Sequence, residues 1–228
     1  MLIEDAAQAW LSERNGVPTG SLGDIAIFCL YKTLGLSDGG AVVSSRPLTA
    51  PAADAGRGLG GLATGLKRRL RQRWDVRDLF GRPNYVPFDP DQDPFEVGDP
   101  VSAPSRLTSF VTRRMADLDI AARRRANYVL LLEQLPELVA TPFSELPDGG
   151  APLQFPIQVD EKSEVLERLA AAGVEGADMW PRAHPSAEAS QSEHVRRLRT
   201  SLVGLPVHHL LGESELARIA KAARSAVS

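Results

Sequence analysis

An apolar run, Ile25-Ala26-Ile27-Phe28-Cys29-Leu30, leads through Tyr31 to Lys32. An unbroken run of this kind is typical of a strand that is buried in a mostly parallel sheet. A charge at the end of a buried strand needs a partner or a function, because burying an unpaired charge is costly. The chain has 26 basic residues, and only four of them are lysines, so a lysine at this place is informative. The run predicts an α/β sheet with Lys32 at the end of one strand.

A carboxylate closes an earlier predicted strand. Leu2-Ile3 leads into Asp5, and the turn Gly39-Gly40 follows Lys32. Pyridoxal phosphate (PLP) chemistry requires such a pair: a lysine that forms a Schiff base with the cofactor aldehyde, and a carboxylate that keeps the pyridinium nitrogen protonated. Simpler interpretations stay open, with Asp5 as the N-cap of a helix over Ala6–Ser12 and Lys32 as a solvated surface charge.

Three phrases of the sequence share their order and spacing with a known family. Residues 4–9 read Glu-Asp-Ala-Ala-Gln-Ala, residues 20–24 read Gly-Ser-Leu-Gly-Asp, and Lys32 stands six residues before Asp38. Together these phrases resemble the DegT/DnrJ/EryC1/StrS family of sugar aminotransferases. The resemblance implies an α/β fold, namely the C-terminal part of the large domain of a PLP-dependent transferase of fold type I, followed by a small α+β C-terminal domain.

The resemblance also assigns roles to individual residues. Lys32 is expected to be the catalytic residue and the Schiff-base partner of the cofactor, and Asp5 is expected to pair with the pyridinium nitrogen. Gln8 corresponds to a glutamine that contacts the ring hydroxyl, and Cys29 stands where the family has a serine that helps to hold the phosphate. His184 lies where family members line the mouth of the substrate site. No Cys, His or carboxylate spacing predicts a metal site.

The activity that the resemblance implies is transfer of an amino group from glutamate or glutamine to a nucleotide-linked keto-sugar. Family members are dimers, and before the point where this chain begins they carry a section that supplies a phosphate-binding turn and a stacked aromatic ring. We therefore expect a homodimer or a completing N-terminal polypeptide, and inactivity of the chain as a truncated product. The alternative is a non-catalytic pseudo-enzyme remnant or one part of a split enzyme.

Composition limits the other classes of function. With 43% hydrophobic residues the chain can form a core, and its net charge of −3 does not favour nucleic-acid binding. No apolar stretch is long enough for a membrane span, and a single cysteine fits a reducing cytoplasm. The basic stretch over residues 66–74 is either an anion-binding helix or a solvated face, and acidic residues nearby favour the second interpretation.

Periodicity predicts the remaining elements. Residues 1–108 are expected to form the remainder of the PLP-binding large domain, and residues 109–228 the linking helix and small domain. Arg123-Arg124-Arg125, on the linking helix, is expected to be a solvated face, and Pro156 predicts an edge strand or a bulge. The expected strands are 2–3, 24–30, 40–44, 153–159 and 202–208, and the expected helices are 6–12, 109–135, 161–172 and 213–227.

Overall fold

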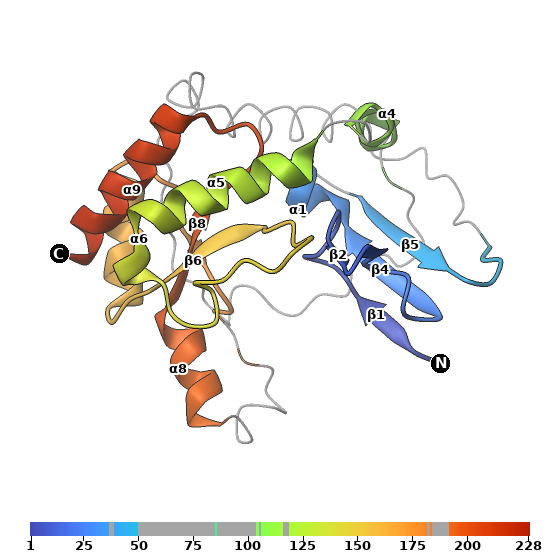
Figure 1. The fold of residues 1–228 in the computed structure, drawn as a ribbon, viewed down its shortest axis with the longest axis horizontal. Coiled ribbons are helices and arrows are strands. Elements are labelled where there is room, and N and C mark those ends of the chain that lie inside the picture. Colours follow the sequence, from blue (N-terminus) through green and yellow to red (C-terminus); the bar gives the residue numbers. More distant parts are fainter. Residues whose placement is uncertain are drawn as a thin grey trace.

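The computed structural model describes residues 1–36, 39–49, 85, 104, 106–115, 119–181, 183 and 192–228. Within these residues the chain is a mixed α/β protein with two three-stranded sheets and a short hairpin. The first sheet comes from the N-terminal residues and the second from the C-terminal half (Figure 1). The expected domain division between residues 108 and 109 stays a prediction. Asp38, His184 and the basic stretch 66–74 lie outside the described residues.

The first sheet has the strand order β1-β4-β5, formed by β1 (Ile3–Asp5), β4 (Ile25–Cys29) and β5 (Gly40–Ser44). β1 runs parallel to β4 and places Asp5 opposite Ile27. β5 runs antiparallel to β4 and places Gly40 opposite Cys29. The sequence predicted all three strands, and the mixed direction arises because the short connection from β4 to β5 allows only an antiparallel return.

A helix over residues 6–12 was expected, and this prediction is wrong. The segment forms successive turns, in which Ala9 N donates to the Ala6 carbonyl and Ser12 N to the Ala9 carbonyl, each at 3.0 Å. Leu11 has φ 70°, which is the left-handed region and is incompatible with a right-handed helix. The chain therefore reverses here instead of continuing as a helix.

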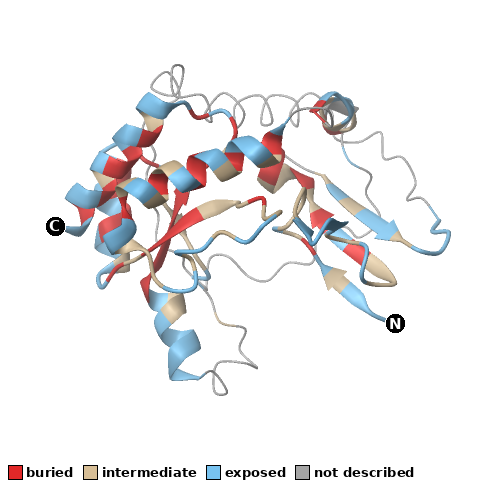
Figure 2. Cartoon of the chain, in the orientation of Figure 1, coloured by how far each residue is buried: buried red, intermediate tan, exposed pale blue. Residues whose placement is uncertain are grey.

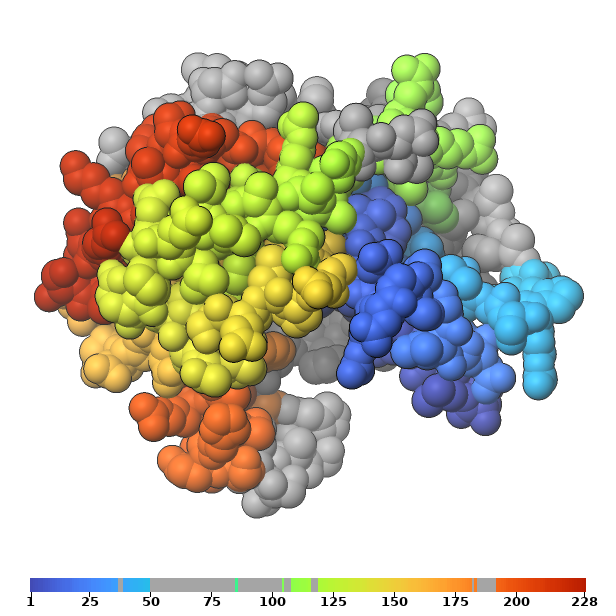
Figure 3. Space-filling view, viewed as in Figure 1, coloured from blue at the N-terminus to red at the C-terminus, as the bar shows by residue number. Residues whose placement is uncertain are grey.

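A two-residue turn follows, at Asn15 (φ 53°) and Gly16 (φ 75°), between β2 (Glu13–Arg14) and β3 (Val17–Pro18). Positive φ at both central residues is the turn geometry that Asn-Gly favours in hairpins. The hairpin contacts the C-terminal half, because Glu13 N donates to the Gly149 carbonyl at 2.9 Å. Figure 3 shows these dark blue N-terminal residues against the yellow segment that contains Gly149.

Lys32 lies in a short helix, where the sequence predicted the end of a strand. β4 stops at Cys29, and α1 (Leu30–Leu34) begins at the next residue. Gly35 ends the helix in the left-handed conformation, at φ 65°, and its N–H donates to the Tyr31 carbonyl at 3.0 Å. The apolar run continues from the strand into the helix, so the run alone did not mark the boundary.

The single long helix expected over residues 109–135 is two helices, α4 (Arg106–Met115) and α5 (Ile120–Gln134). Asp119 starts the second one, because its carboxylate Oδ1 accepts the backbone N–H of Ala122 at 3.3 Å. Figure 1 shows α5 running from the neighbourhood of α1 along the second sheet.

The second sheet has the order β6-β8-β7, formed by β6 (Gln154–Gln158), β7 (Ala177–Asp178) and β8 (Leu202–Pro206). Pro156 belongs to β6 at the sheet edge, as predicted. The helices of this half include α6 (Lys162–Ala171), α8 (Glu193–Ser201) and α9 (Glu213–Val227), and the short 3-10 helix η2 covers Pro136–Leu138. The sequence predicted β6, β8, α6 and α9, but not β7 or α8.

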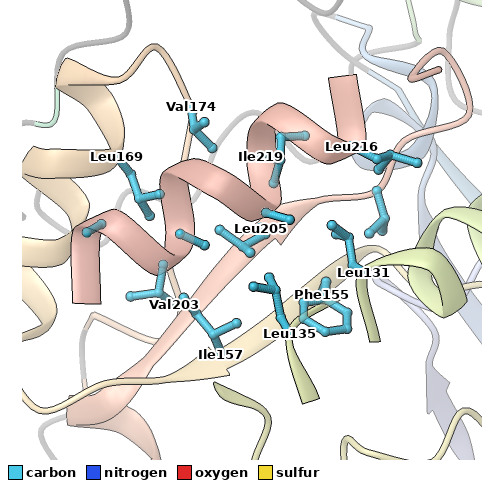
Figure 4. Packing of buried hydrophobic residues seen from close by; sticks show 14 of the residues in the cluster. Leu131, Leu135, Phe155, Ile157, Leu169, Val174, Val203, Leu205, Leu216 and Ile219 are labelled. Atoms are coloured by element: carbon cyan, nitrogen blue, oxygen red, sulfur yellow. The ribbon is translucent and has the colours of Figure 1, made fainter. Parts of the chain in front are cut away.

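The main core of the described residues lies between the second sheet and helices α5, α6 and α9. Phe155 and Ile157 of β6 meet Val203 and Leu205 of β8, and all four are fully buried (Figure 4). Buried positions concentrate on these elements, and α8 is mostly exposed (Figure 2). Burial of large apolar side chains at about 25 cal/mol per Å² is the main force that holds this half together.

Candidate functional site

The carboxyl ends of β1 and β4 lie at one edge of the first sheet, because the two strands are parallel. Asp5 is the last residue of β1, and Lys32 is on the helix that directly follows β4. In open α/β sheets, ligands bind outside the carboxyl ends of the strands. The fold thus brings two of the predicted site residues to one edge.

The Asp5 side chain is exposed, and its carboxylate supports the turn that follows β1. Oδ1 accepts the backbone N–H of Ala7 at 3.0 Å, and Ala6 N donates to the Ile27 carbonyl at 2.9 Å. Oδ2 of Asp5 makes no hydrogen bond with the residues that the structure describes. Gln8 is exposed in the same turn, so both polar side chains can reach a ligand from one segment.

Lys32 is half-buried near the middle of α1. The start of this helix is attached to the glycine turn, because Leu30 N and Tyr31 N approach the Gly39 carbonyl at 3.1 and 3.4 Å. Within the described part of the chain, the Lys32 ammonium makes no ion pair and no hydrogen bond. A lysine on a fixed helix, whose amine has no partner among the residues that the structure describes, is suited to act as a nucleophile.

Cys29 occupies the N-cap position of α1, and its half-buried side chain makes no capping hydrogen bond. The thiol is a weak hydrogen-bond donor compared with the serine hydroxyl that the family resemblance implies here. The structure therefore places this predicted phosphate contact at a helix start, with a poorer donor. His184 lies outside the described residues and cannot be placed beside it.

Glu4 is a residue that the sequence reasoning did not single out. Its carboxylate Oε1 accepts the backbone N–H of Gly20 at 2.7 Å, and Oε2 accepts that of Leu22 at 3.2 Å. Asp24 completes the connection, because its Oδ2 accepts the N–H of Leu2 at 2.7 Å. The signal was present in the sequence, since Glu4 belongs to one family phrase and its partners belong to the next.

Arg124 corrects the expectation of a solvated arginine face. Its side chain is buried, and its guanidinium donates to carbonyl oxygens of three residues: Thr33, Pro152 and Leu153. Burial lowers the pKa of Arg124 to about 10. The adjacent Arg125 is half-buried and donates to carbonyl oxygens of the 147–150 loop. Three consecutive arginines gave no indication that one of them faces inward.

A model of the DegT/DnrJ/EryC1/StrS aminotransferase family matches residues 1–224. The chain belongs to this family. An aminotransferase of the same family from Brucella abortus has a similar fold, with a TM-score of 0.58 and 20% sequence identity over 99% of this chain and 57% of that one. No curated protein matches the chain.

Two further solved structures share the fold. PseC of Helicobacter pylori has a TM-score of 0.60 and 15% identity over 99% of this chain and 59% of its own. DesV of S. venezuelae has a TM-score of 0.59 and 22% identity over 99% of this chain and 58% of its own. The chain therefore spans less than two thirds of the length of these aminotransferases. The α/β fold of PLP-dependent transferases of fold type I is confirmed.

The edge residues of this family member fit PLP at two of its ends. Asp5 offers a carboxylate for a protonated ring nitrogen, and Lys32 offers an amine for an aldehyde. At the phosphate end, Cys29 offers only a thiol. The described residues contain no group of three or more His, Cys, Asp or Glu that could hold a metal ion. None of the described helices is long and apolar enough to cross a membrane.

Proposed function

We propose that the edge of the first sheet is the PLP site of a nucleotide-sugar aminotransferase. In this proposal Lys32 bonds to the cofactor aldehyde, Asp5 pairs with the ring nitrogen, Gln8 contacts the ring hydroxyl and Cys29 lies towards the phosphate. The observation that carries the proposal is that Asp5 ends β1 and Lys32 lies in the helix directly after β4, beyond the carboxyl ends of two adjacent parallel strands.

The reaction proposed is the transfer of an amino group from glutamate or glutamine to a keto-sugar nucleotide. PLP, when bound, supplies an electron sink for a substrate carbanion. Asp5 would hold the ring nitrogen of the cofactor in its protonated form by its negative charge. Lys32 would accept the proton from the substrate carbon and return it, as general base and acid. The sugar aminotransferase CalS13 of Micromonospora echinospora also has a similar fold, which supports this substrate class.

Cofactor attachment to Lys32 tests the proposal directly. The purified chain is incubated with PLP, reduced with borohydride, digested and examined by mass spectrometry for the lysine that carries the cofactor. We expect the mass addition at Lys32 and its loss in Lys32→Ala. Lys221→Ala is the matched control, because Lys221 is exposed on α9 and remote in sequence from the sheet edge. Cofactor addition that is equal at Lys221 and Lys32 contradicts the assignment.

Asp5→Asn tests whether the negative charge of Asp5 matters for its proposed contact with the ring nitrogen, while the size of the side chain is kept. The amide has almost the same size but cannot hold a proton on the ring nitrogen. Cofactor attachment at Lys32 should persist. Transamination, measured with a completing N-terminal polypeptide present, should fall by about 10²–10³-fold, as for the loss of one preorganised electrostatic contact. A variant with unchanged turnover excludes the role of Asp5.

The second candidate function is a non-catalytic chain, or one part of a split enzyme. It is favoured by Cys29, whose side chain makes no capping bond and is a weak donor for a phosphate. Under this alternative the chain alone attaches little PLP and shows no transamination until a completing polypeptide is added. Product formation by the chain alone, from glutamate and a panel of keto-sugar nucleotides, excludes it.

A partner is proposed for the open side of the first sheet. The apolar side chains of Ile3, Ile27 and Val42 are 54%, 39% and 57% exposed, on three adjacent strands. Exposed apolar rows on a sheet mark interaction sites. We propose a second copy of the chain or a completing polypeptide as the occupant. A stable monomer by light scattering at micromolar concentration, with and without the completing polypeptide, contradicts this.

A further inference from the structure

Arg124 is a buried cation held by backbone oxygens from two distant parts of the chain. Its side chain is 2% exposed. Nη2 donates to the Thr33 carbonyl at 3.0 Å, and Nη1 donates to the carbonyls of Pro152 and Leu153 at 3.0 and 3.1 Å. Thr33 is in α1 next to Lys32, and Leu153 directly precedes β6. One guanidinium therefore joins the lysine helix to the second sheet.

Only arginine suits this arrangement. The planar guanidinium carries five N–H donors in a fixed fork and can bond acceptors on two sides at once, whereas the lysine ammonium is a single point charge. A buried charge is expensive unless its hydrogen bonds are made. No carboxylate partner of Arg124 occurs among the residues that the structure describes. The three carbonyl bonds are therefore what offsets its burial.

The bond to the Thr33 carbonyl acts on the final turn of α1, where a helix leaves its last carbonyls without internal partners. The first turn of α1 is attached to the Gly39 carbonyl. Leu34, at the end of the helix, is buried in a small cluster with Met115 and Ile120. The lysine helix is thus fixed at its start by the turn before β5 and at its end by α5.

We propose that Arg124 is a positioning residue for Lys32: it sets the position of α1, and with it the amine of Lys32, relative to the second sheet. The proposal rests on the proposed role of Lys32 as the cofactor lysine. Arg124 itself does not contact the reacting groups. Its effect passes through the Thr33 carbonyl.

The test compares Arg124→Met and Arg124→Lys with Arg125→Met. Arg125 is a matched control, because it lies on the same helix and bonds the carbonyls of Pro147 and Gly150 but not α1. Hydrogen exchange of the peptide that covers residues 30–36 is measured for each protein, without cofactor. We expect about tenfold faster exchange of this peptide in Arg124→Met, the change expected when a hydrogen bond to a charged group is lost, and none in Arg125→Met.

The second readout is the chemical reactivity of the Lys32 amine. A variant that only destabilises another part of the protein does not change it. The chains are treated with limiting acetic anhydride, and acetylation at Lys32 is expressed relative to acetylation at the exposed Lys221. We expect this ratio to change in Arg124→Met, to change less in Arg124→Lys, which keeps the charge, and to stay as in the parent in Arg125→Met. If Arg124→Met does not fold, Arg124→Lys decides the comparison.

An unchanged ratio and unchanged exchange in both Arg124 variants overturn the proposal, as does an equal change in Arg125→Met. Neither readout uses PLP. Borohydride trapping tests the proposed function separately. If it finds no cofactor at Lys32 in the parent chain, the proposed function is wrong, and the positioning of α1 by Arg124 has no catalytic role. If the exchange and acetylation change in the Arg124 variants, and the trapping experiment separately finds cofactor at Lys32, then the positioning role of Arg124 and the proposed function are both supported.

Discussion

The carboxylate of Glu4 accepts the backbone N–H of Gly20 at 2.7 Å and so joins β1 to the loop that precedes β4. The second oxygen accepts the N–H of Leu22 in the same loop. Because the loop leads directly into β4, these bonds stabilise the parallel register in which Asp5 lies opposite Ile27. Glu4 thus acts on the candidate site without belonging to it.

Glu4→Gln should destabilise the chain. The glutamine side chain has one acceptor oxygen in place of two and no charge, so one of the two backbone N–H groups loses its partner. We expect the free energy of unfolding to fall by about 1–3 kcal/mol, measured by urea denaturation. Glu13→Gln is the control, because Glu13 is exposed on the hairpin. Equal stability of the two variants would contradict the role of Glu4.

Gly20→Ala should be more harmful than Gly16→Ala. Both glycines have positive φ, 95° and 75°, so both substitutions carry the cost of a left-handed alanine, about 1 kcal/mol. A Cβ at Gly20 would also meet the Phe28 ring at 2.5 Å, whereas a Cβ at Gly16 has nothing within 4 Å. The overpacking should add about 1–3 kcal/mol at Gly20 alone. Thermal unfolding of both variants measures the difference.

The sequence predicted correctly those elements that begin or end at capping, glycine-turn or proline residues. The helix expected over residues 213–227 has those bounds in the structure, and Glu215 accepts the N–H of Gly212 at 2.6 Å as an N-terminal capping contact. The strand over residues 40–44 follows the glycine turn, also as predicted. Pro156 correctly indicated an edge strand, since proline lacks the N–H that a central strand needs.

The errors arise where tertiary contacts outweigh local pattern. The residues after Asp5 have good helix propensity, but the chain reverses there to form the hairpin that bonds Gly149. The burial of Arg124 could not be predicted, because its partner carbonyls at residues 33 and 152–153 are close only in the folded chain. For the candidate site, the sequence named Asp5 and Lys32, and only the fold shows that they share a sheet edge.

Lys162→Met should destabilise the second half of the chain. The Lys162 ammonium bonds the Asp178 carboxylate at 2.5 Å and the carbonyls of Met179 and Arg199 at 2.7 and 2.8 Å, which joins α6 to β7 and α8. Its loss leaves a largely buried carboxylate without its cation, at a cost of about 1–3 kcal/mol. Urea denaturation of Lys162→Met and of the exposed-site control Lys221→Met measures this. A loss no greater than that of the control would refute the prediction.

Tyr128 should make stability depend on alkaline pH. Burial raises the pKa of the Tyr128 hydroxyl from its ordinary value of 10.0 to about 12, and this hydroxyl donates to the Phe143 carbonyl. Between these pH values the unfolded chain has lost the proton that the folded chain keeps, so stability falls as the pH rises.

The measurement is the free energy of unfolding of the parent minus that of Tyr128→Phe. This difference should be constant below about pH 10 and should decline towards pH 12. Arg124 has a lowered pKa in the folded chain, so its titration makes stability rise with pH over the same range. This contribution is the same in both proteins and cancels from the difference. A difference that stays flat across this interval would show that Tyr128 titrates alike in both states.

The bond between Arg124 and Thr33 has a consequence for folding during synthesis. Thr33 leaves the ribosome first, and the side chain that completes its hydrogen bonding is 91 residues further along the chain. At roughly 5–20 residues per second, translation of that interval takes about 5–18 seconds. During this time the segment that carries Lys32 is in the cell without its final support. Nascent chains that end before Arg124 should therefore be cleaved by protease in α1, and chains that extend beyond β6 should resist.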